Sequence, residues 1–145
     1  AKDYVAMQWL MLQQKKPKDF VIATGRKETV RKFIEISAKK LKWYKEPNGP
    51  SILWEGNGVN EVGRRADNGN IVIKIDQRYF RPTEVDKLLG DPSKAQKELG
   101  WTPKISLEDI ISEMILFDKE EAKKELILKE SGINIATNFE SPPSN

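Results

Sequence analysis

The sequence contains no cysteine and no histidine among its 145 residues. The lack of cysteine excludes disulfides, thiolate metal sites and cysteine nucleophiles, and the lack of histidine removes the most common general base and metal ligand. Any acid–base chemistry in this chain must therefore use Asp, Glu, Lys or Tyr. No apolar run reaches the roughly 18 to 20 residues of a membrane span, and the N-terminus lacks the apolar stretch of a secretory signal. These absences predict a cytoplasmic protein with no membrane partner.

An excess of one charge sign is also lacking. The 25 basic and 22 acidic residues are interspersed and leave a formal net charge of +3. Nucleic-acid binders concentrate basic side chains on one face, so no nucleic-acid partner is expected, and the slight positive balance favours small anionic ligands. The length falls in the range of a single domain with one modest core.

Apolar periodicity and capping residues predict five helices. The first, over residues 4–15, places Val5, Trp9 and Leu12 on one face, so that it needs a partner. The others are expected at 30–41 with Thr29 as N-cap, at 82–89, at 92–99 with Pro92 in the first position and Gly100 just past the end, and from 107 after the capping-box variant Ser106-Leu107-Glu108-Asp109.

Short strands are expected between these helices. Residues 19–25 form an apolar run that ends at Gly25 and predict a short buried strand. Residues 52–54 and 71–75 predict two more strands, with turns at Asn57-Gly58 and Asn68-Gly69 between them. The fold class is therefore α/β, with mixed helices and short strands over residues 1–132. Residues 133–145 have too little apolar content to pack and are expected to form a disordered tail.

Arg81 and Glu84 are the sharpest candidate site residues, within Arg81-Pro82-Thr83-Glu84. The planar guanidinium of Arg81 can hold a pyrophosphate with two parallel hydrogen bonds, and Glu84 could accept hydrogen bonds from two ribose hydroxyls. A plain structural interpretation stands beside this one. Arg81 precedes a helix that begins with Pro82, and Glu84 is a carboxylate that complements the helix N-terminus.

No segment of the chain has the pattern of a dinucleotide-binding loop or of a catalytic Tyr-x-x-x-Lys pair. The run 56–63 contains three glycines after an apolar strand, but the glycine spacing is wrong and no amphipathic helix follows, so it is interpreted as a turn. The three tyrosines are followed four positions later by Gln8, Asn48 and Thr83. No catalytic, cofactor-binding or metal-binding residue is therefore expected here.

Several stretches together resemble one known family. They are Asp3-Tyr4-Val5, 7–13, 19–25, Val30-Arg31-Lys32-Phe33, 78–85 and the Gly90 to Pro103 segment. In these stretches the chain resembles the C-terminal part of the GDP-mannose 4,6-dehydratases, which are extended short-chain dehydrogenases/reductases. The last stretch is shared more widely by extended members of that superfamily, whereas the earlier ones point to the dehydratases.

The resemblance implies a nucleotide-sugar-binding region, in which Arg81 and Glu84 contact the diphosphate and the ribose of GDP-mannose. It also implies that the longer enzyme is a homo-oligomeric, NADP-dependent lyase connected with GDP-fucose biosynthesis. Such an enzyme oxidises the hexose at C4, eliminates water across C5 and C6, and returns the hydride to C6. The NADP site and most of the Rossmann core would lie upstream of Ala1, and residues 1–25 would pack on that missing half. The chain alone is then expected to be an inactive fragment, with the Thr24-Gly25 turn as a further candidate near the pocket.

Two alternatives stay open at this point. A neighbouring class is another nucleotide-sugar dehydratase or an epimerase, which would differ in the nucleotide sugar that it consumes. A non-enzymatic alternative is a stand-alone nucleotide-sugar-binding module. An upstream strand, glycine-rich turn and helix in the same reading frame would distinguish the enzyme from the module.

Overall fold

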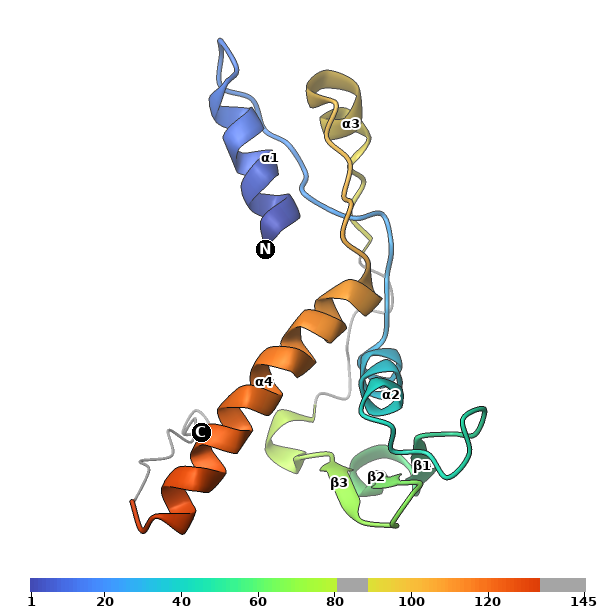
Figure 1. Cartoon of the computed structure of the whole chain (residues 1–145). Helices are drawn as coiled ribbons and strands as arrows, with labels where there is room; N and C mark the ends of the chain where they lie inside the picture. The colour runs from blue at the N-terminus through green and yellow to red at the C-terminus, as the bar shows by residue number, and fades with distance from the viewer. Residues whose placement is uncertain (81–88, 134–145) are drawn as a thin grey trace.

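The structure, a computed structural model, describes residues 1–80 and 89–133. In this part of the chain two α-helices precede a small three-stranded sheet and two follow it, as Figure 1 shows. The elements are α1 (Lys2–Leu12), α2 (Val30–Lys40), β1 (Ile52–Glu55), the 3₁₀ helix η1 (Gly58–Asn60), β2 (Val62–Arg65), β3 (Ile71–Lys74), the 3₁₀ helix η2 (Gln77–Tyr79), α3 (Ser93–Leu99) and α4 (Leu107–Glu130). The predicted helix at 82–89 falls almost entirely outside the described residues, and so does the tail from 134 onward.

The predicted starts of α2 and α4 are confirmed by their caps, whereas α1 runs from Lys2 to Leu12 and so begins and ends before the predicted 4–15. The Thr29 hydroxyl accepts a hydrogen bond from the Lys32 amide at 3.0 Å at the start of α2. Ser106 and Asp109 form a complete capping box, in which each side chain accepts from the other residue's amide. Helix α3 begins one residue later than predicted. Pro92 is its N-cap and not its first helical residue, because the Pro92 carbonyl accepts the first helical hydrogen bond, from the Gln96 amide at 3.0 Å.

The three strands form one antiparallel sheet in the order β1-β2-β3. Strand β2 was not predicted, because Val62-Gly63-Arg64-Arg65 lacks alternating apolar residues. Its place is set by the turn that follows it, where Gly69 has φ 77° and donates its amide to Arg65 O at 2.9 Å. This left-handed backbone conformation favours glycine, so the Asn68-Gly69 turn is confirmed and brings β2 beside β3.

The strand predicted over residues 19–25 is wrong. These residues run as an extended connection between α1 and α2, and no strand in the described residues pairs with them. A buried strand of this kind needs neighbours on which to complete its backbone hydrogen bonds. The segment lies instead beside the start of α3, where Lys94 Nζ donates to Asp19 O at 2.7 Å.

Helices α1 and α3 share a small apolar core. Met7, Ala95 and Trp101 are buried there, and Leu10 and Phe20 are among the partly buried side chains packed around them. The opposite face of α1 is open, as the sequence predicts. Val5, Trp9 and Leu12 are 60, 61 and 82% exposed.

Hydrogen bonds at Asp3 join the start of α1 to the segment before α4. Trp101 Nε1 donates to the Asp3 carbonyl at 3.0 Å. The Asp3 carboxylate accepts from the amides of Lys104 and Ile105, both at 2.9 Å. Because these contacts join residues about a hundred positions apart, they hold the start of the chain against the segment just before α4.

Helix α2 lies between the sheet and α4. The Arg31 guanidinium stacks 4.0 Å from the centre of the Trp54 ring, and Trp54 Nε1 donates to Glu35 at 3.3 Å. On the other side, α2 packs on the first half of α4, where Ile111 is fully buried. Figure 1 shows this arrangement, with α1 and α3 at the opposite end of the molecule from the sheet.

Candidate functional site

The two predicted site residues, Arg81 and Glu84, lie outside the described residues. The segments on both sides of them are described. The structure therefore places the chain before them, just after the sheet, and after them, beside residues 21–23. The two flanks of the site are residues 76–80 before it and residues 89–90 after it.

The upstream flank carries a guanidinium that the sequence analysis did not select. Asp76 caps η2 by accepting from the Arg78 amide at 3.0 Å, and Arg78 Nη2 reaches back to Asp76 Oδ2 at 2.6 Å. The side-chain hydrogen bonds from Arg78 are the main cause that lowers the pKa of Asp76 to about 2, and the backbone hydrogen bond adds to them. The same side-chain pair raises the pKa of Arg78. The spacing of Arg78 and Arg81, three residues apart, is the signal that could have revealed it.

Aromatic rings accompany this guanidinium. The side chains of Tyr79 and Phe80 are about half exposed, at 54 and 46%. The Arg78 guanidinium carbon lies 5.9 Å from the centre of the Tyr79 ring. Because Asp76 already pairs with this guanidinium, the upstream flank offers exposed aromatic rings but no unpaired cation.

The downstream flank returns the chain to the extended connection between α1 and α2. A Cβ atom placed on Gly90 would lie 2.7 Å from Ala23 Cβ and 3.2 Å from Val21 Cγ1. This close approach requires glycine. It brings the end of the candidate segment next to residues 21–23, and the Thr24-Gly25 turn follows directly. In that turn the Thr24 hydroxyl accepts from the Arg26 amide at 3.2 Å.

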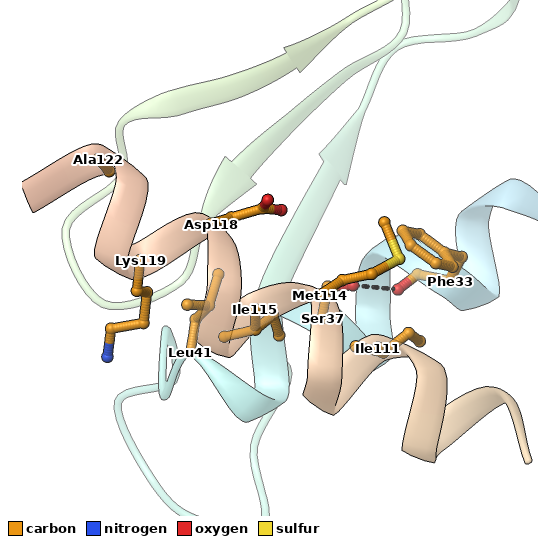
Figure 2. Close-up of a pocket in the computed structure, with 9 residues that line it drawn as sticks. All are labelled: Phe33, Ser37, Leu41, Ile111, Met114, Ile115, Asp118, Lys119 and Ala122. Atoms are coloured by element: carbon orange, nitrogen blue, oxygen red, sulfur yellow. Dashed lines mark hydrogen bonds between the residues drawn. The ribbon is translucent and has the colours of Figure 1, made fainter. Parts of the chain in front are cut away.

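A separate cavity of about 330 Å³ lies between α2 and α4, and Figure 2 shows the side chains around it. Most of them are apolar, including Phe33, Leu41 and Ile111. The Ser37 hydroxyl already donates to the Phe33 carbonyl at 2.8 Å, as the dashed line marks. Since a nucleotide sugar needs charged and polar partners, this groove has the chemistry of helix packing and not of substrate binding.

The described residues do not fit a dinucleotide or a metal ion. The run from Gly56 leads into η1, which has three residues and is followed by strand β2, so no long helix presents its N-terminus to phosphates. A Cβ at Gly56 would lie 2.5 Å from Asn60 O, which explains this glycine by the turn itself. Within residues 1–80 and 89–133, no three metal-ligating side chains come together, and no helix is long and apolar enough to cross a membrane.

Comparison with known proteins identifies the family. A protein-family model described as GDP-mannose 4,6 dehydratase matches residues 1–114. The chain belongs to the GDP-mannose 4,6-dehydratase family. The match includes α1, the sheet, both flanks of the candidate segment, and the first two turns of α4. The resemblance that the sequence motifs indicated is thereby confirmed.

Individual members of the dehydratase family agree with this match. The GDP-mannose 4,6-dehydratase of Yersinia enterocolitica is 44% identical over 97% of this chain, and that of Vibrio cholerae is 46% identical over 97%. The human GDP-mannose 4,6 dehydratase is 45% identical over 83% of the chain. The chain covers 39, 38 and 30% of these three relatives, so it spans about two fifths or less of their length.

Proposed function

We propose that this chain is the C-terminal, nucleotide-sugar-binding part of a GDP-mannose 4,6-dehydratase, with Arg81 and Glu84 as substrate-binding residues. The observation that carries the proposal is the identity of 44 to 46% to two bacterial dehydratases along 97% of the chain, including the segment around Arg81. The longer enzyme would convert GDP-mannose to GDP-4-keto-6-deoxy-mannose. Neither alternative, another nucleotide-sugar enzyme or a stand-alone binding module, has an observation that favours it.

The residues of this chain would bind and orient the nucleotide part of the substrate. The Arg81 fork would hold two oxygens of the diphosphate, a geometry that a lysine ammonium cannot reproduce. Glu84 would accept hydrogen bonds from the ribose hydroxyls. Arg78 is paired with Asp76 at 2.6 Å, so this ion pair adds no net charge at the entry to the segment and is given no phosphate contact.

NADP, which the family implies, would be bound by the part of the enzyme that this chain does not include. The described residues offer no glycine-rich loop before a helix, and the sequence has no Tyr-x-x-x-Lys pair. We therefore derive no redox or proton-transfer step from this chain and propose that it is inactive alone. Residues 1–132 would form the substrate-binding region, with 1–25 packed on a Rossmann half. The homo-oligomeric and cytoplasmic state of the longer enzyme stays a prediction.

The proposal is tested by joining this chain in frame to the part of the Yersinia relative that it does not match. Arg81→Lys in the joined protein keeps the charge and loses the two-pronged geometry. A lost charge-assisted hydrogen bond is worth roughly 1.5 to 3 kcal/mol, so the Kd for GDP-mannose should rise by about one to two decades. Glu84→Gln should cost less, because the amide still accepts one hydroxyl hydrogen bond. Calorimetric titration with GDP-mannose gives these values.

Two controls make this test specific. Arg78→Lys is the matched substitution in the same segment, and it should weaken GDP-mannose binding less than Arg81→Lys because Asp76 already occupies the Arg78 fork. Titration with NADP should give unchanged affinity in each variant. Equal GDP-mannose affinity in Arg81→Lys and the unaltered protein would show that the Arg81 guanidinium does not bind the diphosphate and that Arg81 only precedes a helix. A 4-keto-6-deoxy product formed by this chain alone with NADP and GDP-mannose would refute the proposed inactivity.

A further inference from the structure

Residues 76–80, the upstream flank of the candidate segment, form a turn that is exposed along its whole length. The backbone hydrogen bonds of this turn run from the Tyr79 amide to Asp76 O at 3.0 Å and from the Phe80 amide to Gln77 O at 3.3 Å. Short 3₁₀ pieces have poor hydrogen-bond geometry, and burial does not support this one. The turn therefore needs a further contact to keep one conformation.

The Asp76 side chain supplies that contact. Asp76 Oδ1 accepts from the Arg78 amide at 3.0 Å and from Arg78 Nε at 3.1 Å, and Asp76 Oδ2 accepts from Arg78 Nη2 at 2.6 Å. The carboxylate thus caps the turn and also holds the guanidinium of the residue that it caps. Beyond the turn, the backbone of Phe80 is extended, with φ −70° and ψ 122°.

A second aspartate–arginine pair with the same spacing has different surroundings. Arg65 Nη2 lies 2.6 Å from Asp67 Oδ2, and both side chains are 28% exposed. The Arg65 guanidinium stacks 4.5 Å from the centre of the Trp43 ring, and the Asp67 amide donates to Trp43 O at 3.2 Å. This pair is part of the packing of the sheet. The side chains of Asp76 and Arg78 are 41 and 63% exposed, and an ion pair so exposed adds little to stability.

The position of the Asp76 pair indicates a use other than stability. Arg81 follows Phe80 directly, whereas eight positions separate it from Leu89 on the downstream flank. Because a chain is constrained most closely by its nearest fixed residues, the turn limits the course of the backbone at Arg81 more than the downstream flank does. A backbone that leaves a fixed turn has fewer directions open to it, so a ligand that binds its side chains has less ordering to impose.

We propose that Asp76 is a positioning residue for substrate binding, because its cap holds the turn that presents Arg81 and Glu84 to GDP-mannose. Asp76 itself touches no substrate atom. The guanidinium of Arg78 neutralises the capping carboxylate, so that the cap does not repel the diphosphate. This inference rests on the proposed substrate-binding role of Arg81 and Glu84, and it adds a residue outside the motif that contains them.

The test compares Asp76→Asn with Asp76→Ala in the chain joined to the unmatched part of the Yersinia relative. Both variants lose the carboxylate charge and release Arg78, so they differ in the cap, which asparagine provides as well as aspartate and alanine does not. In calorimetric titration, Asp76→Ala should bind GDP-mannose roughly fivefold more weakly than Asp76→Asn, the change that corresponds to one lost cap. When Arg81→Lys is added to both, the difference should fall below about twofold, because the cap then has less to position.

Three further readouts separate positioning from a structural role. The thermal midpoints of Asp76→Asn and Asp76→Ala should agree within about 2 °C, because the turn is exposed. Their affinities for NADP should be equal. Asp67→Asn and Asp67→Ala are the matched control for the same kind of pair, and they should differ in GDP-mannose affinity by less than about twofold, because the Asp67 pair lies in the packing of the sheet.

The outcomes distinguish this inference from the proposed function. Equal GDP-mannose affinities of Asp76→Asn and Asp76→Ala, in a protein whose binding Arg81→Lys weakens, would overturn the positioning role and leave the proposed function standing. An Arg81→Lys variant that binds GDP-mannose normally would overturn both. A difference between Asn and Ala at position 76 that persists unchanged with Arg81→Lys, or that also appears in NADP affinity and thermal midpoint, would assign Asp76 to general stability and overturn the positioning role.

Discussion

The region of α1 and α3 and the region of α2 and the sheet are held together in different ways. Contacts in the sheet region join residues close in sequence. Arg64 pairs with Glu55, nine positions away, and Arg31 with Glu61, thirty positions away. Contacts in the region of α1 and α3 join distant residues, such as Trp101 to Asp3 and Lys18 to Glu98, which are 98 and 80 positions apart.

This difference shows which region depends more on residues that are distant in the sequence. Local contacts close short loops at small entropic cost, so the sheet region can form from a continuous stretch of about fifty residues. The region of α1 and α3 joins the start of the chain to residues 93–105, and it still leaves one face of α1 uncovered. The sheet is therefore held by contacts between nearby residues, although α2 also packs on α4, whereas the region of α1 and α3 depends on distant residues and leaves apolar side chains of α1 exposed.

The largest expected effect tests the core between α1 and α3. Trp101 is 4% exposed, and its indole donates to the Asp3 carbonyl. Trp101→Ala should lower the free energy of unfolding by about 3 to 5 kcal/mol, the range for a large buried ring. Trp9→Ala, which removes the same ring from the 61% exposed face, should cost about 0.5 kcal/mol or less. Urea unfolding followed by circular dichroism measures both. Equal losses would show that the two faces of α1 are buried alike.

The second effect tests the clamp at Asp3. Asp3→Ala removes a carboxylate that accepts from the amides of Lys104 and Ile105 at 2.9 Å. Two hydrogen bonds to a charged acceptor should make the loss about 2 to 3 kcal/mol at this partly exposed position. Lys2→Ala, which removes the neighbouring exposed ion pair to Glu113, should cost less than about 1 kcal/mol. The same urea experiment distinguishes them, and an Asp3→Ala loss no larger than that of Lys2→Ala would contradict the clamp.

A pair of glycine substitutions compares close packing in the two regions. Gly90→Ala drives a methyl group to 2.7 Å from Ala23 Cβ, an atom that moves only with its backbone. The cost should be about 1 to 3 kcal/mol. In the sheet, Gly63→Ala meets the flexible Ile73 Cδ1 at the same 2.7 Å, with Ile73 Cβ and the Trp54 ring at 3.1 Å, so partial repacking should keep the cost to about 1 to 2 kcal/mol. Thermal unfolding of both variants checks the order. A larger loss for Gly63→Ala would reverse it.

The smallest effect concerns Asp76, at the exit from the sheet region. Because its pKa is lowered from 3.8 to about 2, its pair with Arg78 contributes stability above about pH 4 and loses it as the pH falls through 2. An NMR titration of the Asp76 carboxyl should have its midpoint near 2, and Arg78→Ala should move that midpoint up toward 3.8. An unchanged midpoint in Arg78→Ala would show that the pair does not form.

Local signals in the sequence predicted most of the helices. The caps at Thr29 and Ser106 and the exposed face of Val5, Trp9 and Leu12 are confirmed, because each depends on residues within a few positions of one another. The strand at 19–25 was wrong because its apolar pattern reflects neighbours that the described residues do not provide. Strand β2 was missed because it is set by the register with β1 and β3 and not by its own residues.

The candidate site was predicted from a short motif and a family resemblance, and not from the local periodicity that predicted the helices. Arg81 and Glu84 were selected by their chemistry and their spacing, and their roles stay predictions. Asp76 and Arg78 were missed, because an aspartate two residues before an arginine is common and becomes informative only when a 3₁₀ turn brings the two side chains together.

Hydrogen exchange, measured residue by residue, tests the central contrast between the two regions most directly. The chain alone is compared with the chain joined to the unmatched part of the Yersinia relative. We predict that joining slows exchange in α1 by roughly tenfold or more, because its exposed face with Val5, Trp9 and Leu12 becomes covered. Exchange in β1 and β2 should change by less than about twofold, because these strands already pair within the described residues. Equal protection of α1 in both proteins, or a gain confined to the sheet, would contradict the account.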